Sequence, residues 1–382
     1  MKKQKICIIG GGLTGLVTAI GLSKLNCEID LFTESFSQNL VSIRTIAVSE
    51  NNFEFLNQLN FSHLLKKQAW VCSKLKLYTE NESEKFSEIF ELDKENKNEN
   101  IFYMLENSKI LKMMMNEVKK SKSISLKNNK KVLSVYNSGL LKCVKLQNSI
   151  LKYNLVIICS GTNSNLIKNL FDSKIIKNSY KEFAVTTILS HKSLKNNVAR
   201  QIFLDNEILA MLPISKNKTS IVLSLKNIMR EKNDSFLKSK IKNYASNYLE
   251  KIKLSSKIEK KDLNLLIRNK YYSNRILLFG DALHIMHPFV GQSFNMTLRD
   301  LKILKKILKD KLNLGLDIGG DDVLSEFSDK AKPNNFSFLI GSDILKNALS
   351  FKKPRNNLFK ILNKNNLLKN VVFDVANKGF RF

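Results

Sequence analysis

The amino-acid sequence predicts an α/β fold, in which a nucleotide-binding domain on a parallel sheet carries an inserted antiparallel-sheet domain and is followed by a helical C-terminal tail. Several short apolar segments have the pattern of strands that are buried on both faces, and each runs into a turn marked by glycine or an acidic residue. They are residues 5–9, 28–33, 153–159 and 275–280. Because these segments lie far apart in the chain, we expect one domain assembled from separated parts.

The stretch between the last two of these segments predicts a different sheet. Strand-like patterns recur there at residues 183–190, 208–213 and 220–225, which is typical of antiparallel pairing. Residues 82–100 are acidic and rich in asparagine, and they predict a surface excursion. We therefore expect a nucleotide-binding domain of residues 1–75, 100–175 and 268–330, an inserted substrate domain of residues 76–99 and 176–267, and a helical region of residues 331–382.

The composition limits the classes of protein that the chain can be. Of its 382 residues 43% are hydrophobic, which excludes disorder as a description of the whole chain. Lys and Arg total 63 against 34 Asp and Glu, and the net charge of +29 would by itself favour a nucleic-acid or anionic-membrane binder. Only eight of these basic residues are Arg, the residue that nucleic-acid readers use most for bidentate base contacts. The lysine and asparagine excess is typical of an AT-rich genome, so we expect no nucleic-acid partner.

Cysteine and histidine usage argues against metal sites and disulfide bonds. The five cysteines form no C-x-x-C pair, and four histidines leave little material for a metal centre. An apolar run at residues 6–22 follows three lysines, but four glycines within six positions break it, and it has no small-residue cleavage site. We expect a cytoplasmic protein without a resident metal ion.

The turn after the first predicted strand carries a G-x-G-x-x-G motif. In a strand–turn–helix unit the first glycine permits the tight turn, the second allows backbone to approach a pyrophosphate, and the third lets the helix pack closely. An acidic residue at the end of the next strand can accept hydrogen bonds from ribose hydroxyls. The predicted cofactor contacts are Gly10, Gly12, Leu13, Thr14, Gly15 and Glu34. The motif predicts a Rossmann-like dinucleotide site, and its alternative is a plain packing turn.

A second cluster, between residues 275 and 300, indicates which dinucleotide is bound. A Gly-Asp pair after a strand would place a carboxylate near a ribityl chain, and a Gly-Gln pair at a helix start would point that helix N-terminus at the pyrimidine end of an isoalloxazine. The positive end of the helix dipole stabilises an anionic reduced flavin. The predicted contacts are Gly280, Asp281, Gly291, Gln292, Ser293 and Asn295.

Together these motifs resemble those of the FAD-dependent aromatic hydroxylases, a group of flavoprotein monooxygenases, and in particular its ubiquinone-biosynthesis subgroup. Residues 42–49, 103–107 and 208–214 and the tail from residue 349 to 369 are also similar to segments of that family. The resemblance implies a tightly bound FAD, a pyrophosphate contact from Arg44, and a polar contact to the flavin from Asn107. It also implies NAD(P)H as co-substrate.

The resemblance further implies the reaction. In this family NAD(P)H reduces the flavin, O2 adds at flavin C4a, and the resulting hydroperoxide delivers oxygen to an electron-rich ring. The implied substrate is a polyprenylated phenol or quinol on the ubiquinone route, with other ubiquinone-synthesis proteins as candidate partners. Pro288 is the predicted wall beside the flavin, and His287 is the candidate general base, with a hydrogen-bonded loop histidine as its alternative. Alternatives for the whole chain are a hydroxylase or oxidase of a soluble aromatic and a non-catalytic FAD-binding subunit.

Two positions depart from the family pattern, and the tail leaves a choice open. Ser160 stands where the family has an Asp that helps hold FAD and is implicated in NAD(P)H use, and Ser293 stands where it has a glycine. In the tail, apolar residues follow helical spacing with lysines off the stripe. The stripe comprises Leu358, Ile361, Leu362, Leu368, Val371 and Val372. It predicts a helix that docks on the protein body or on the inner face of the cytoplasmic membrane, and docking on the body is favoured.

Overall fold

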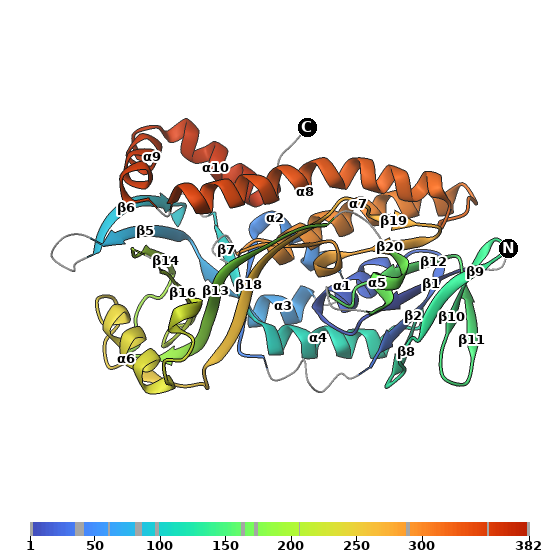
Figure 1. The fold of residues 1–382 in the computed structure, drawn as a ribbon, viewed down its shortest axis with the longest axis horizontal. Helices are drawn as coiled ribbons and strands as arrows, with labels where there is room; N and C mark the ends of the chain where they lie inside the picture. The colour runs from blue at the N-terminus through green and yellow to red at the C-terminus, as the bar shows by residue number, and fades with distance from the viewer. Residues whose placement is uncertain are drawn as a thin grey trace.

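The structure is a computed structural model that describes residues 3–34, 42–59, 62–80, 86–95, 99–161, 165–171, 175–205, 207–287, 291–349 and 351–379. Figure 1 shows two sheets side by side along the long axis, with the helix α8 (Asp321–Leu349) running over both of them. The smaller helices α9 (Lys352–Lys364) and α10 (Asn366–Lys378) fold back over the inserted domain. The molecule is therefore an α/β protein with a nucleotide-binding domain, a second sheet domain and C-terminal helices, as the sequence predicts.

The nucleotide-binding domain is built on a six-stranded sheet in the order β19-β20-β12-β1-β2-β8. Its strands are β1 (Gln4–Ile9), β2 (Cys27–Thr33), β8 (Ile124–Asn128), β12 (Leu155–Ile158), β19 (Tyr272–Ser273) and β20 (Ile276–Leu278). All pairs except β19 with β20 are parallel. Helices cover the faces of a parallel sheet. Here α1 (Leu13–Leu22) contacts both α4 (Asn107–Lys120) and α7 (Ser293–Asn313). The four predicted strands thus lie together, and β8 is an additional strand at the edge.

The inserted domain is a larger, mostly antiparallel sheet in the order β21-β18-β13-β16-β15-β14-β5-β6. Its strands are β5 (Lys74–Glu80), β6 (Phe86–Asp93), β13 (Ile175–Ser190), β14 (Val198–Phe203), β15 (Ile208–Ser215), β16 (Lys218–Lys226), β18 (Glu259–Arg268) and β21 (His284–Ile285), with β17 (Lys253–Leu254) beside β13. The helix α6 (Asp234–Ala245) packs Leu237 and Ile241 against this sheet. Two small sheets complete the fold. One contains β3 (Thr45–Ser49), β7 (Phe102–Glu106) and β4 (Trp70–Cys72), and the other contains β9 (Ser134–Ser138), β10 (Leu141–Lys145) and β11 (Ile150–Tyr153).

The prediction of a surface excursion at residues 82–100 is wrong for the part that forms β6. This strand is the edge of the large sheet and pairs antiparallel with β5. Its acidic residues face lysines of the neighbouring strand: Lys74 bonds Asp93 at 2.8 Å, and Lys76 bonds Glu88 at 2.9 Å. The acids are thus cross-strand partners that stabilise the pairing, whereas in the sequence they resemble a solvated loop.

The tail packs against the inserted domain through one of its faces. Phe359 and Phe373 are buried in a cluster with Phe90 of β6. Arg355 donates to the Thr79 hydroxyl, and Lys369 Nζ donates to the Glu91 carbonyl at 3.0 Å. Docking on the protein body, the favoured prediction, is therefore observed, but the predicted stripe is only partly the docked face. Leu358 and Leu362 pack against this cluster, whereas Ile361, Leu368 and Val371 are 38–60% exposed. In the described part of the chain no helix is long and apolar enough to cross a membrane.

Candidate flavin-binding site

The G-x-G-x-x-G turn connects β1 to α1 and has no room for larger side chains at two of its glycines. Gly10 has φ +125°, and a Cβ there would lie 2.7 Å from the Cys159 carbonyl carbon. A Cβ on Gly15 would lie 1.8 Å from the Gly10 carbonyl oxygen. A Cβ on Gly12 would meet nothing within 4 Å, and no side chain caps the helix that starts after it. The N–H groups at the start of α1 therefore face open space, which suits a pyrophosphate.

Two contacts in this turn were not predicted from the sequence. A Cβ on Gly11 would lie 2.3 Å from Thr33 Oγ1, so the turn also packs against the end of β2. A Cβ on Gly280, which has φ +61°, would lie 2.5 Å from Thr14 Cγ2. The two glycine clusters therefore touch, although they lie at opposite ends of the domain in sequence. The run of three glycines from residue 10 was the signal that could have identified Gly11.

Glu34 follows the last residue of β2 and is well exposed. Its side chain is 65% accessible, and Lys131 lies 4.0 Å from its carboxylate. At this distance and exposure the ion pair contributes little. The carboxylate thus has free acceptor capacity at the strand end where a ribose would lie, which fits its predicted role.

The predicted contacts Arg44 and Asn107 are neighbours in space. The Asn107 backbone N–H donates to the Arg44 carbonyl at 2.9 Å, because β3 and β7 pair antiparallel next to both residues. Asn107 begins α4, whose N-terminus has no side-chain cap. The Arg44 side chain is half-exposed, and its Nε lies 3.9 Å from Glu259 Oε2 on the inserted domain. A guanidinium and a helix N-terminus therefore face the same region.

The second cluster forms a cradle at the start of α7. Asp281 lies exposed in a short 3-10 turn and accepts a hydrogen bond from the Ser293 hydroxyl at 3.3 Å. Gln292 is the N-cap of α7 and is buried, yet its Oε1 has no hydrogen-bond partner among the described residues. Gly291 has φ +62°. A buried acceptor without a donor indicates a missing partner, and with the open space at Gly12 it shows that these residues fit FAD.

Asn295 has a structural role that the sequence did not reveal. Its Nδ2 donates to the Ala47 carbonyl at 2.9 Å, and its Oδ1 accepts from the Ser49 N–H at 3.0 Å and from Asn52 Nδ2 at 3.1 Å. The amide thus ties the start of α7 to β3 and α2 (Glu50–Asn57). Because these bonds use the side chain, the predicted contact with the cofactor would come from the Asn295 backbone N–H, in the first turn of α7.

His287 is buried and is bonded to a carboxylate of the inserted domain. Its Nε2 lies 3.1 Å from Glu182 Oε2, and Lys346 Nζ of α8 lies 2.9 Å from Glu182 Oε1. Burial lowers the pKa of His287, although Glu182 acts in the opposite direction, so the imidazole is neutral at pH 7. Burial raises the pKa of Glu182, but hydrogen bonds from His287 and Lys346 outweigh it and the net pKa is lowered.

The geometry around His287 agrees with the hydrogen-bonded loop histidine that was the alternative to a general base. A neutral imidazole can still accept a proton, so the bond to Glu182 leaves the catalytic prediction standing. Pro288, the predicted wall beside the flavin, lies outside the described residues. Ser160, which stands where the family has an Asp, follows β12 and is exposed.

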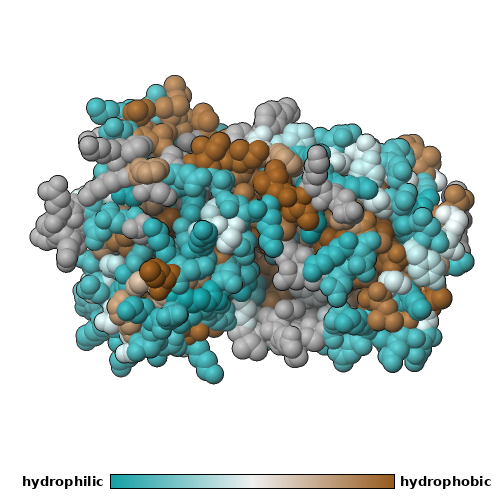
Figure 2. All heavy atoms as spheres, viewed as in Figure 1, coloured by the Kyte–Doolittle hydropathy of each residue, from teal (hydrophilic) through white to brown (hydrophobic). Residues whose placement is uncertain are grey.

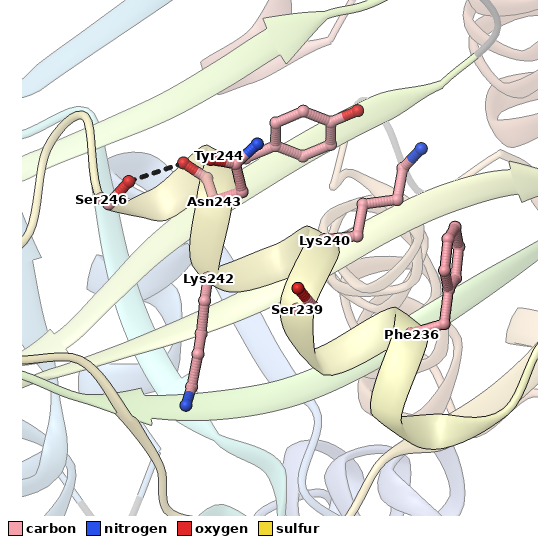
Figure 3. A pocket seen from close by; sticks show the side chains of 7 residues that line it. All are labelled: Phe236, Ser239, Lys240, Lys242, Asn243, Tyr244 and Ser246. Carbon is pink, nitrogen blue, oxygen red and sulfur yellow. Dashed lines mark hydrogen bonds between the residues drawn. The ribbon is translucent and has the colours of Figure 1, made fainter.

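A surface depression elsewhere has no relation to this site. Figure 3 shows its lining along one helix, α6, where Phe236, Lys240 and Tyr244 lie on one side and Lys242 extends away from them. Ser246 Oγ donates only to the backbone carbonyl of Asn243, at 2.7 Å. Figure 1 shows α6 on the side of the large sheet that faces away from the nucleotide-binding domain. Lys240 and Tyr244 of this lining both bond the Glu207 carboxylate, at 2.7 Å and 3.3 Å, so their polar groups are already used within the inserted domain.

Comparison with known proteins agrees with a flavin site. A sequence model described as the FAD binding domain matches residues 3–333. The mitochondrial ubiquinone biosynthesis monooxygenase COQ6 of Dictyostelium discoideum is 25% identical, over 97% of this chain and 90% of that protein. The ubiquinone hydroxylase UbiL of Rhodospirillum rubrum is 40% identical over a shorter stretch, 22% of this chain and 19% of that protein.

Solved structures share the fold at low sequence identity. The p-nitrophenol 4-monooxygenase PnpA of Pseudomonas putida superposes with a TM-score of 0.75 at 15% identity, over 100% of both chains. A family match that spans most of the sequence is the stronger finding: the chain belongs to the FAD binding domain family and is an FAD-dependent monooxygenase that resembles the ubiquinone-biosynthesis hydroxylases.

Proposed function

We propose that the protein hydroxylates the ring of a polyprenylated phenol or quinol in ubiquinone biosynthesis, with O2 as the oxygen source and NAD(P)H as the reductant. The observation that carries this proposal is the similarity to COQ6 of Dictyostelium discoideum along nearly the whole chain. The open phosphate-binding turn and the unpartnered Gln292 Oε1 support FAD as the cofactor. When bound, FAD supplies the activation of O2 at its C4a atom.

The chain's own residues position the reactants. The N-termini of α1 and α7 provide N–H groups and positive dipole ends toward the cofactor's phosphates and ring. His287 is the candidate acceptor of the phenol proton, and Glu182 fixes its ring through Nε2. The large sheet of the inserted domain provides the substrate side of the site.

Quinone intermediates in a deletion strain test the proposal. Mass spectrometry is expected to show an accumulated prenylated precursor that lacks one ring hydroxyl, and the wild-type gene should remove it. An unchanged quinone profile would contradict the proposal. Purified protein should turn over prenylphenol analogues and not soluble phenols. Bound FAD that is not reduced by NAD(P)H in the presence of substrate would instead indicate the non-catalytic subunit.

We also propose that the outer face of the tail rests on a lipid surface, where a polyprenyl substrate would be reached. Figure 2 shows apolar side chains gathered along the tail helices. By their exposure, Phe351, Ile361, Leu367 and Val371 of this part of the chain are 57–77% accessible to solvent. Exposed apolar side chains on helices next to lysines are typical of peripheral membrane contacts. This surface would hold the protein at the inner face of the cytoplasmic membrane.

A further inference from the structure

Lys261 of β18 points toward the flavin-binding site from the inserted domain. Side chains alternate along a strand, and Lys260 lies on the opposite face, where its Nζ is 3.3 Å from the Lys232 carbonyl and 3.7 Å from Asp234. Glu259, on the same face as Lys261, accepts from the Ile43 N–H at 3.2 Å and pairs with Arg44. Lys261 therefore lies on the face that meets the residues next to the predicted pyrophosphate contact.

Two charged groups of the nucleotide-binding domain act on Lys261. Desolvation lowers the pKa of the Lys261 ammonium, Arg44 lowers it further by repulsion, and Asp281 raises it by attraction. Lys261 therefore lies within electrostatic range of both Arg44 and Asp281. Neighbouring protein atoms partly desolvate its ammonium, but the residue still reaches solvent and forms no hydrogen bond or ion pair with another described residue. Two cations thus stand close together at the place where a pyrophosphate is expected.

We propose that Lys261 binds the pyrophosphate of FAD together with Arg44, so that the inserted domain as well as the nucleotide-binding domain holds the cofactor. This proposal rests on FAD binding, and it adds a ligand that the glycine motifs do not contain. A doubly charged anion between the two cations would attract both of them, and this attraction would outweigh their mutual repulsion. Glu259 lies 3.9 Å from the Arg44 guanidinium on the same strand face, so Arg44 and Lys261 lie near the same carboxylate.

Titration of the apoprotein of the full chain tests the proposal. FAD affinity would be measured by the quenching of flavin fluorescence at fixed ionic strength. K261Q should raise the Kd for FAD about tenfold, as expected for the loss of a charge-assisted hydrogen bond. K261R should keep the Kd within about threefold of the wild-type value, because the charge remains. K260Q is the matched control, since its side chain lies on the opposite face, and it should leave the Kd unchanged.

Riboflavin separates a phosphate contact from other effects. It has the ring and the ribityl chain but no phosphate, so K261Q should not change its affinity. Equal losses for FAD and riboflavin would overturn the assignment to the pyrophosphate, and so would a K261Q protein with unchanged FAD affinity. A rise in the NAD(P)H half-saturation constant alone would also overturn it. Failure of the wild-type protein to bind FAD would contradict the family assignment itself.

Discussion

Individual glycines determine whether the phosphate-binding turn can form. Gly10 and Gly15 lie so close to neighbouring backbone that a single methyl group would collide with it, whereas Gly12 faces open space. The sequence motif predicted all three positions and separated the two glycines that serve the turn and the packing from the one that faces the ligand, and the space around each glycine agrees with that division. This distinction leads to opposite expectations for two similar substitutions.

Gly15→Ala and Gly12→Ala should separate stability from cofactor binding. Gly15→Ala should lower the free energy of unfolding by about 3–5 kcal/mol, because its Cβ would overlap the Gly10 carbonyl oxygen. Gly12→Ala should change it by less than about 1 kcal/mol, since the backbone there is extended and the surroundings are empty. It should nevertheless weaken FAD binding, because the new methyl group would occupy the space of the pyrophosphate. Urea unfolding of the apoprotein and FAD titration give the two values. A stable Gly15→Ala protein would contradict the packing argument.

Asn295→Leu should show whether the amide serves the fold or the flavin ring. The substitution leaves the Ser49 N–H and the Ala47 carbonyl without their side-chain partner in a buried region. We expect a loss of about 2–4 kcal/mol in the free energy of unfolding. Apoprotein prepared without FAD should lose the same amount as the holoprotein. A loss seen only with FAD bound would indicate direct contact of the side chain with the cofactor.

His287 and Glu182 should make stability fall as the pH is lowered. Both groups have pKa values below their ordinary values of 6.5 and 4.5 in the folded protein, so the unfolded chain binds more protons. The free energy of unfolding therefore rises with pH in these ranges, and acidification from pH 7 to pH 5 should reduce it through His287. His287→Gln keeps an N–H donor for Glu182 and cannot titrate, so it should flatten this part of the profile. Urea unfolding at several pH values measures the difference, and identical profiles would contradict the assignment.

The elements at the edge of the large sheet were hard to predict because their partners are distant in sequence. The charges of β6 are neutralised by β5, and its apolar residues are covered by α9 and α10 from the end of the chain. Phe359 lies 5.5 Å from Phe90 between ring centroids, which fixes the tail on this strand. Without the tail, the apolar face of β6 would be exposed.

Phe359→Ala should release the tail, whereas Ile361→Ala should not. Phe359 is 6% exposed, and its loss should lower the free energy of unfolding by about 3 kcal/mol. Ile361 is 60% exposed on the same helix, and its substitution should cost less than about 0.5 kcal/mol. Limited proteolysis near residue 350 should accelerate only in the Phe359 variant. Equal behaviour of the two variants would mean that the helix packs differently.

At the scale of the whole molecule, the net charge of +29 mostly follows from the lysine-rich composition of the chain. Within the tail, Lys346 pairs with Glu182, and Arg355 and Lys369 bond to the inserted domain. These cations are therefore not available to an anionic lipid. The proposed membrane contact would then rest mainly on the apolar side chains of the outer face of the tail.

Vesicle sedimentation tests this prediction. The wild-type protein should sediment with vesicles, and a Phe351→Ser, Leu367→Ser and Val371→Ser variant should sediment several-fold less. These residues are 67%, 77% and 57% exposed, so the fold should tolerate the changes, and an unchanged FAD content would confirm this. Raising the salt concentration should reduce binding only weakly, because apolar contacts dominate. Unchanged sedimentation of the variant would indicate that these side chains contact a protein partner, or that the net charge of the protein causes the binding to vesicles.

The sequence by itself determined the α/β class, four of the six strands of the nucleotide-binding sheet and the two glycine motifs that predict a flavin site. These features depend on local patterns: apolar runs, glycine turns and helix starts, which are encoded within a few residues. Only the tertiary structure decided that β6 is a strand, that Asn295 serves the fold, that Glu182 and Lys346 hold His287, and that Lys261 shares a strand face with Glu259, the partner of Arg44. Each of these depends on contacts between segments far apart in the chain, and a single sequence carries no local pattern for them.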